Sequence, residues 1–152
     1  MDAMVLRSLA RWPDVPDVYG WLALDRRGQW RLRGERIGHP ALRDFIGRNY
    51  ACDPRGRWFF QNGPQRVFVE LAYAPWVVRW EGAGWVDQAG APFPAGQPWL
   101  DEEGSVLLAG RGSVALVDDR DLPRYVEEAD RLPRIAGAEV PARFGFARNP
   151  AP

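Results

Sequence analysis

The sequence predicts an α+β domain, mainly an antiparallel sheet that is strongly curved or partly closed and is accompanied by two short helices. Three observations lead to this class. Short runs in the middle of the chain alternate apolar and polar residues, turns containing Gly or Asn separate these runs, and two segments have helical spacing. We therefore expect roughly seven or eight short strands.

The first residues, 1–16, are expected to form an arm. Pro13 and Pro16 stop any helix there that is longer than about one turn. The runs VYGWLALD (18–25) and QWRLRG (29–34) follow, on either side of an Arg-Arg-Gly turn. This arrangement predicts the first β-hairpin.

Two helices are expected. The first is ALRDFIGRNY (41–50), which Pro40 opens and whose apolar residues share one helical face. The second is LPRYVEEADR (122–131), for which Asp121 is the expected cap.

The remaining strands lie between these helices. RVFVELAY (66–73) alternates, with Val67, Val69, Leu71 and Tyr73 on one face, which indicates a strand with one buried face. The stretch GAPFPAGQP (90–98) is too rich in Pro and Gly for regular structure and is expected to be a loop. The other expected strands are RWFFQ (57–61), WVVRW (76–80), GWVDQ (84–88), SVLLAG (105–110) and SVALVDD (113–119).

Residues 1–131 are expected to form a single domain, because the chain length suits one core. Residues 132–152 contain four prolines and little periodicity, so a mostly loose tail is expected there.

Two blocks of the sequence resemble each other. LDRRGQWRLRG (24–34) and LDEEGSVLLAG (100–110) share Leu, Asp, Gly, Leu and Gly at matching positions, and the segments 41–46 and 121–126 align after them. A structural repeat would give two ββα units that flank a central meander. Independent convergence of two hairpin turns on Asp and Gly is the alternative.

The composition excludes several classes of function. The net charge is +0, which removes the simplest argument for a nucleic acid or a membrane surface as partner. All the basic residues are Arg, so there is no lysine nucleophile or P-loop lysine. With a single Cys and a single His, neither a disulfide nor a multi-histidine zinc site can form within the chain. Without a signal peptide or an apolar run of membrane length, a cytoplasmic location is expected.

The first half of the chain carries two longer motifs, HPALRDFIGRNY (39–50) and GRWFFQNGPQRV (56–67). In these motifs the chain resembles a bacterial family of small uncharacterised proteins that share a domain of unknown function. The resemblance is close over about the first 80 residues. It implies a bacterial cytosolic protein and assigns no catalytic residue.

His39 is the first candidate for acid–base chemistry, because an imidazole titrates near neutral pH. In that hypothesis it pairs with Asp44 or Cys52 in a small enzyme. The alternative is a structural histidine at the start of a helix. The acidic turns at 101–103 and 118–121 are interpreted as solvated caps, so neither a metal site nor a cofactor is predicted.

The eight tryptophans and the nearby arginines have two interpretations. Aromatic and cationic side chains together can bind single-stranded nucleic acid. They can equally stabilise a thin sheet through cross-strand and cation–π pairs, which is the interpretation we prefer. The residues that would form the nucleic-acid surface are Arg55, Arg57, Trp58, Phe60 and Arg66.

The stretch WFFQNGPQRVFV (58–69) is the best local candidate for recognition. Asn62-Gly63 explains the turn, but the polar residues around it exceed what a turn requires. We therefore predict a non-enzymatic binding or interaction module whose partner is a protein or a small anionic ligand. Its expected binding residues are Arg57, Trp58, Gln61, Asn62, Gln65 and Arg66. A purely structural corner is the alternative.

Overall fold

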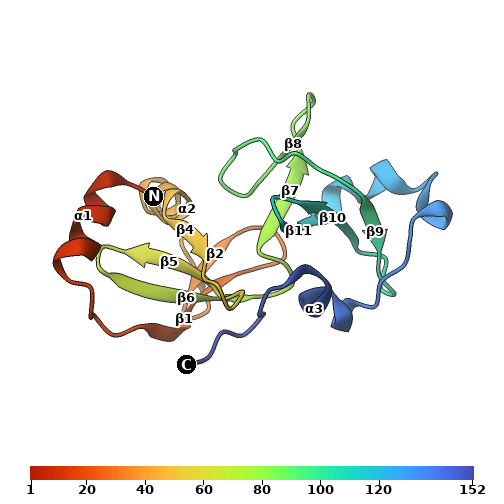
Figure 1. Cartoon of the computed structure of the whole chain (residues 1–152). Helices are drawn as coiled ribbons and strands as arrows, with labels where there is room; N and C mark the ends of the chain where they lie inside the picture. The colour runs from red at the N-terminus through yellow and green to blue at the C-terminus, as the bar shows by residue number, and fades with distance from the viewer. The chain divides into compact units, whose positions relative to one another are not determined.

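The computed structural model describes residues 1–152, and the chain divides into two compact units (Figure 1). Unit 1 comprises Met1–Asp25, Gln29–Ala72 and Ala147–Pro152. Unit 2 comprises Arg26–Gly28 and Tyr73–Phe146. Each unit is built on one β-sheet, and no helix has the length and apolar character needed to cross a membrane.

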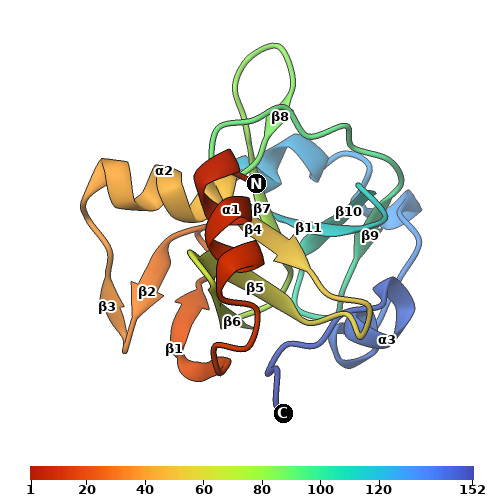
Figure 2. The ribbon, with the colours of Figure 1, turned by 60° about the vertical axis from the view of Figure 1, so that its left-hand side comes forward.

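Unit 1 contains a 6-stranded sheet with the order β3-β2-β1-β6-β5-β4. Neighbouring strands are antiparallel except for β1 and β6, which run parallel. The helix α2 lies beside this sheet (Figure 2), with Phe45 edge-on to Phe60 at a centroid distance of 5.5 Å. The elements of unit 1 are α1 (Ala3–Arg11), β1 (Val18–Leu24), β2 (Trp30–Leu32), β3 (Glu35–Arg36), α2 (Pro40–Arg48), β4 (Tyr50–Cys52), β5 (Trp58–Asn62) and β6 (Gln65–Leu71).

Unit 2 contains a 5-stranded sheet with the order β8-β7-β11-β10-β9, in which only β7 and β11 run parallel. One face of the sheet packs on Phe93 and Leu132. The elements of unit 2 are β7 (Trp76–Trp80), β8 (Trp85–Val86), β9 (Pro98–Leu100), β10 (Val106–Gly110), β11 (Ser113–Val117), the 3-10 segments η1 (Asp119–Tyr125), η2 (Ala129–Arg131) and η3 (Gly137–Glu139), and α3 (Val140–Phe144).

The two sheets repeat one topology. In each, the first strand pairs parallel with the last, and the last three strands form an antiparallel meander, β4-β5-β6 in unit 1 and β9-β10-β11 in unit 2. The registers also match. Phe60 pairs with Val67, and Leu108 pairs with Ala115, so that equivalent residues are 48 positions apart.

The structural repeat is therefore not the one that the sequence similarity suggested. Blocks 24–34 and 100–110 share an Asp-x-x-Gly turn, in which the Asp25 or Asp101 carboxylate accepts the N–H of the fourth residue after it. The two turns lie at different places in their sheets, since one joins β1 to β2 and the other joins β9 to β10. The ββα description is wrong as well, because residues 119–125 form a 3-10 helix. Similar turns at Asp53 and Asp87 show how readily this local geometry recurs.

The α+β, mainly antiparallel fold class is confirmed. The strands are more numerous than expected, however, and they form two open sheets in place of one. The helix at 40–48 forms as expected, with Pro40 in its first turn. The first arm differs from its prediction, because Ala3–Arg11 is a nine-residue helix anchored by the buried Val5.

The C-terminal segment is more ordered than the expected loose tail. Val140 and Phe146 are buried, and residues 137–144 are helical. The Arg148 carbonyl accepts the N–H of Leu71, so that the last residues extend unit 1.

Candidate functional site

The predicted binding corner is divided between two faces of the β5–β6 hairpin. Gln61 pairs with Arg66, and Asn62 pairs with Gln65. Since successive side chains of a strand point to opposite faces, the two pairs cannot form one surface. The structure therefore separates Gln61 and Arg66 from Asn62 and Gln65.

The two side chains on the first face, Gln61 and Arg66, form hydrogen bonds within unit 1. Gln61 is 1% exposed, and its Nε2 donates to the Gly63 carbonyl at 2.9 Å. The Arg66 guanidinium donates to both oxygens of Asp17, at 3.0 and 2.8 Å, and lies 5.1 Å from the centre of the Phe68 ring. These hydrogen bonds tie both side chains to neighbouring residues of unit 1.

Arg57 and Trp58 also belong to the interior. The Arg57 Nε donates to Asp53 at 2.8 Å, and its Nη1 donates to the Tyr19 hydroxyl and to the Ala151 carbonyl. Trp58 is 8% exposed and packs against Tyr50. Both side chains are buried and contact other residues of unit 1.

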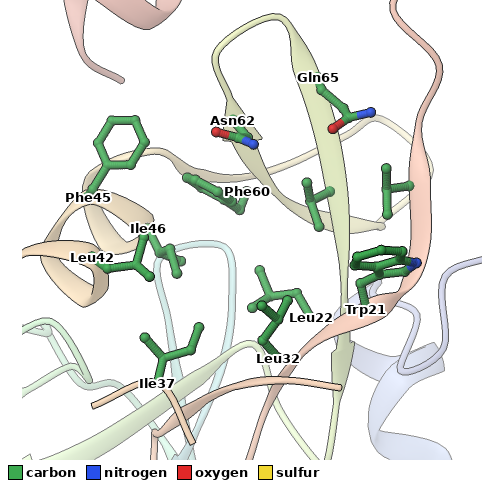
Figure 3. A pocket seen from close by; sticks show the side chains of 12 residues that line it. Trp21, Leu22, Leu32, Ile37, Leu42, Phe45, Ile46, Phe60, Asn62 and Gln65 are labelled. Carbon is green, nitrogen blue, oxygen red and sulfur yellow. The ribbon is translucent and has the colours of Figure 1, made fainter. Parts of the chain in front are cut away.

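The second face of the hairpin borders an apolar pocket of about 490 Å³ within unit 1 (Figure 3). Side chains from α2, from the sheet and from the turn before α2 surround it, and Asn62 and Gln65 are its two polar members. Its size is within the range of ligand sites in proteins. The lining residues are Val18, Trp21, Leu22, Leu32, Ile37, Leu42, Phe45, Ile46, Phe60, Asn62, Gln65 and Val67.

A bulge in β1 directs Trp21 into this pocket. Val18 pairs with Val67 and Leu22 pairs with Val69, so β1 advances by four residues where β6 advances by two. Gly20 has a φ of +77°, a conformation that glycine adopts without strain. In a regular strand Trp21 and Leu22 would face opposite sides, whereas here both line the pocket.

The pocket region has polar groups that the fold leaves available. The Asn62 side chain is exposed and makes no hydrogen bond within the chain, while the Gln65 Nε2 donates to the Pro16 carbonyl at 3.1 Å. The Arg33 guanidinium lies 3.7 Å from the centre of the Trp21 ring and forms no ion pair. Arg33 also has a φ of 50°, which is strained for a residue other than glycine.

The other candidate residues lie apart from this pocket. His39 is exposed at the N-cap of α2 and makes no capping hydrogen bond, and Asp44 is exposed as well. The Cys52 Sγ donates to the Asp53 carbonyl at 3.4 Å. Desolvation, followed by the negative charge of Asp53, raises the pKa of the Cys52 thiol, which is the opposite of what a nucleophilic thiolate needs. No three His, Cys, Asp or Glu side chains in residues 1–152 are grouped as metal ligands.

The residues of the nucleic-acid hypothesis do not share a surface either. Phe60 lines the pocket, Arg66 is paired on the opposite face, and Arg55 is exposed at the turn that precedes β5.

Alanine substitutions in the hairpin should distinguish the structural role of Gln61 from that of Asn62 on the opposite face. We expect Gln61→Ala to lower the free energy of unfolding by about 1–2 kcal/mol, because the part-buried Gly63 carbonyl loses its donor and a buried side chain is truncated. Asn62→Ala should change it by less than about 0.5 kcal/mol, since that amide has no partner in the chain. Urea unfolding of the two variants checks this. Equal losses would mean that Asn62 is structural too.

Sequence reasoning identified Asn62 and Gln65 but missed the apolar walls of the pocket. The apolar face with Leu42, Phe45 and Ile46 is visible in the sequence, where its spacing predicts a helix but no pocket. The bulge that turns Trp21 had one signal, Gly20, within an otherwise regular strand.

Two solved structures share the fold. A crystal structure of a DUF1285 family protein from Silicibacter pomeroyi DSS-3 matches with a TM-score of 0.54 and 16% identity, covering 84% of each chain. A DUF1285 family protein from Shewanella baltica OS155 matches with a TM-score of 0.53 and 16% identity, covering 70% of this chain and 91% of the other. No curated protein matches the chain. The family described as "Protein of unknown function (DUF2946)" matches residues 1–151, and the chain therefore belongs to that family.

Proposed function

We propose that the protein is a non-enzymatic binding module whose site is the apolar pocket of unit 1. The observation that carries this proposal is a pocket of about 490 Å³ with two amide side chains among apolar walls. A partner would insert an apolar group and hydrogen-bond to Asn62 and Gln65, whose amides can each donate and accept. We further propose a bacterial, cytoplasmic setting, in agreement with the single free cysteine.

The exposure of the walls supports this proposal. Trp21, Leu32 and Leu42 are 46%, 44% and 43% exposed, although each is a large apolar side chain. Neighbouring apolar side chains that remain open to water together often mark a binding site. Burying them under a partner would remove this apolar surface from water.

Arg33 adds a preference for an anionic or aromatic partner. Its guanidinium lies over the Trp21 ring without a carboxylate partner, whereas the similarly stacked Arg111 of unit 2 is paired with Asp87 at 2.7 Å. An unpaired cation that stacks on a lining side chain can attract a carboxylate, a sulfonate or the face of an aromatic ring to this side of the pocket.

A fluorescent probe tests the proposal. 8-Anilinonaphthalene-1-sulfonate combines aromatic rings with an anion, and we expect it to bind the full-length protein at one site with increased fluorescence. Val67→Trp places a large side chain where Val67 lines the pocket and should abolish that binding.

Val126→Trp is the matched control, because Val126 is 72% exposed and lies in unit 2. It should leave probe binding unchanged, and circular dichroism should show that both variants are folded. Undiminished probe binding to folded Val67→Trp would exclude the pocket as the site.

A further inference from the structure

We propose that the unit 1 pocket binds a small carboxylic acid in its ionised form, with its carboxylate on the Arg33 guanidinium and its apolar body in the pocket. This inference rests on the proposed function and names the ligand class. Three features of unit 1 support it: the backbone conformation of Arg33, the lack of a counterion for its guanidinium within the chain, and the apolar character of the pocket walls.

Arg33 occupies a backbone position that suits other residues better. Leu32 pairs with Glu35 across the β2–β3 hairpin. The two residues between them, Arg33 and Gly34, have φ values of 50° and 84°. Positive φ at both central residues is the mark of a type I′ turn, whose first position favours Asn, Asp or Gly. The turn itself therefore gives no reason for an arginine, whose backbone is strained there.

The same local arrangement occurs in unit 2, where the arginine has a carboxylate partner. Arg111 is the first of the two residues that join β10 to β11, and its φ is 52°. Its guanidinium stacks on Trp76 at 4.5 Å, as that of Arg33 does on Trp21. Its Nη1 also donates to the buried carboxylate of Asp87 at 2.7 Å. The two turns hold different places in their sheets, so the likeness is one of local geometry.

This likeness indicates which group Arg33 lacks. An arginine held on a tryptophan by such a turn binds a carboxylate in unit 2, whereas the N–H groups of the Arg33 guanidinium make no hydrogen bond within the chain. A guanidinium presents its N–H groups in a fixed plane, and two of them match the two oxygens of a carboxylate. Stacking on Trp21 also restricts the Arg33 side chain, so less freedom is lost when an anion binds.

The pocket walls limit the rest of the ligand to an apolar body. In Figure 3 Trp21 lies across the pocket from Leu42 and Ile46 of α2, so a ligand with its carboxylate on the Trp21 side extends toward the helix. The only polar lining side chains, Asn62 and Gln65, can meet one hydroxyl or carbonyl group on that body. A peptide would instead bring an N–H and a C=O with every residue, and each needs a partner when it is buried.

Octanoate tests the inference, with 1-octanol as its neutral match. We expect octanoate to bind the full-length protein at one site in isothermal titration calorimetry and to displace the fluorescent probe. It should bind about tenfold more tightly than 1-octanol, because only the carboxylate pairs with Arg33. Hexanoate should bind about fifteenfold more weakly than octanoate, since each methylene group moved from water into the pocket contributes about fourfold in affinity.

Arg33→Asn removes the cation and keeps the turn. Asn-Gly is a preferred pair for a type I′ turn, so we expect the melting temperature to stay unchanged, with relief of strain offsetting the lost stacking. Octanoate should bind this variant about tenfold more weakly, and 1-octanol should bind it as it binds the wild type.

The same substitution elsewhere supplies the controls. Arg111→Asn should lower the melting temperature, because the buried Asp87 loses its counterion, yet it should leave octanoate binding unchanged. Arg55→Asn, at an exposed arginine of unit 1, should change neither quantity. Val67→Trp should abolish the binding of both octanoate and 1-octanol.

The outcomes separate this inference from the proposed function. If 1-octanol binds as tightly as octanoate and Arg33→Asn changes neither affinity, the ligand class is wrong, while Val67-dependent binding of the fluorescent probe upholds the pocket. N-acetyl-leucyl-leucine carries its carboxylate on a peptide, and tighter binding of this compound than of octanoate would assign the site to a peptide terminus and overturn the inference. If the probe, octanoate and 1-octanol all fail to bind, both proposals fail.

Discussion

Replacing Asp53 with alanine should lower the free energy of unfolding by about 3 kcal/mol, one of the largest effects expected from a single polar substitution in this chain. The Asp53 Oδ1 accepts the N–H groups of Arg55 and Arg57, both at 2.9 Å. Its Oδ2 accepts the Arg57 Nε at 2.8 Å, and the two side chains of this ion pair are 4% and 10% exposed. Alanine would leave a buried guanidinium without its counterion and two N–H groups without their acceptor.

The same carboxylate should make stability depend on pH. Burial alone would raise the pKa of Asp53, but the hydrogen bonds from Arg57, its positive charge and the N–H of Arg55 together bring the pKa below its ordinary value. A carboxyl group whose pKa is depressed in the folded state stabilises the fold above its unfolded-state pKa. Its contribution is therefore fully present at neutral pH and is lost as the pH falls below about 4.

Chemical denaturation at pH 7 and at pH 3 measures both effects. The difference between the wild type and Asp53→Ala should be largest at pH 7 and should shrink in acid. Asp53→Asn keeps an acceptor for the two N–H groups and should lose less stability than the alanine variant. Asp14→Ala, at an exposed aspartate without an ion pair, should change stability by less than about 0.5 kcal/mol. A pH-independent difference would show that the charge of Asp53 contributes nothing.

Local signals in the sequence predicted the elements that local chemistry determines. The alternation in 66–73 predicts the strand β6, the Asn-Gly-Pro-Gln corner at 62–65 predicts the hairpin turn, and Pro40 predicts the start of α2. Alternation suggested one buried face, yet both Phe68 and Val69 are buried, at 1% and 0% exposed. A strand that is buried on both faces need not alternate apolar and polar residues in its sequence, because both faces accept apolar side chains.

The division into two sheets depended on contacts that no local pattern encodes. β1 pairs with β6 and β7 pairs with β11, each parallel and each across several intervening elements. Antiparallel hairpins are visible in a sequence because a short turn joins their strands, whereas a parallel pair needs a long connection. For the same reason the sequence similarity is visible at the Asp-x-x-Gly turns, where convergence is the alternative, and not at the 48-residue shift between the meanders.

The sequence predicted some residues of the candidate site but could not tell which of two adjacent amides, Gln61 and Asn62, would lie at it. Gln61 and Asn62 look alike in a sequence, but strand geometry sends them to opposite faces. One becomes a buried structural amide, and the other lies at the pocket. Register decides which is which, and register depends on the turn and on the packing of the whole hairpin.

Phe93→Ala should lower the free energy of unfolding by about 4 kcal/mol, because a buried aromatic ring leaves a cavity behind. The loss includes the packing of the ring on Trp76 and its cation–π contact with Arg111. Urea unfolding followed by circular dichroism measures it, with Pro94→Ala, at an exposed neighbour, as the control. A loss below about 1 kcal/mol would mean that Phe93 does not anchor its segment.

The same variant tests what fills this face of the unit 2 sheet. Removing the Phe93 ring should turn a filled face into an empty one, and an apolar cavity of this kind can bind a small aromatic molecule such as benzene. We therefore expect benzene to raise the melting temperature of Phe93→Ala more than that of the wild type, since a ligand that binds only the folded state stabilises it. Gly110→Ala should destabilise the wild type, in which a Cβ would be 2.6 Å from the ring, more than it destabilises Phe93→Ala. Coupling of this sign would establish that the Phe93 side chain, and not the backbone of its segment alone, fills this face of the unit 2 sheet.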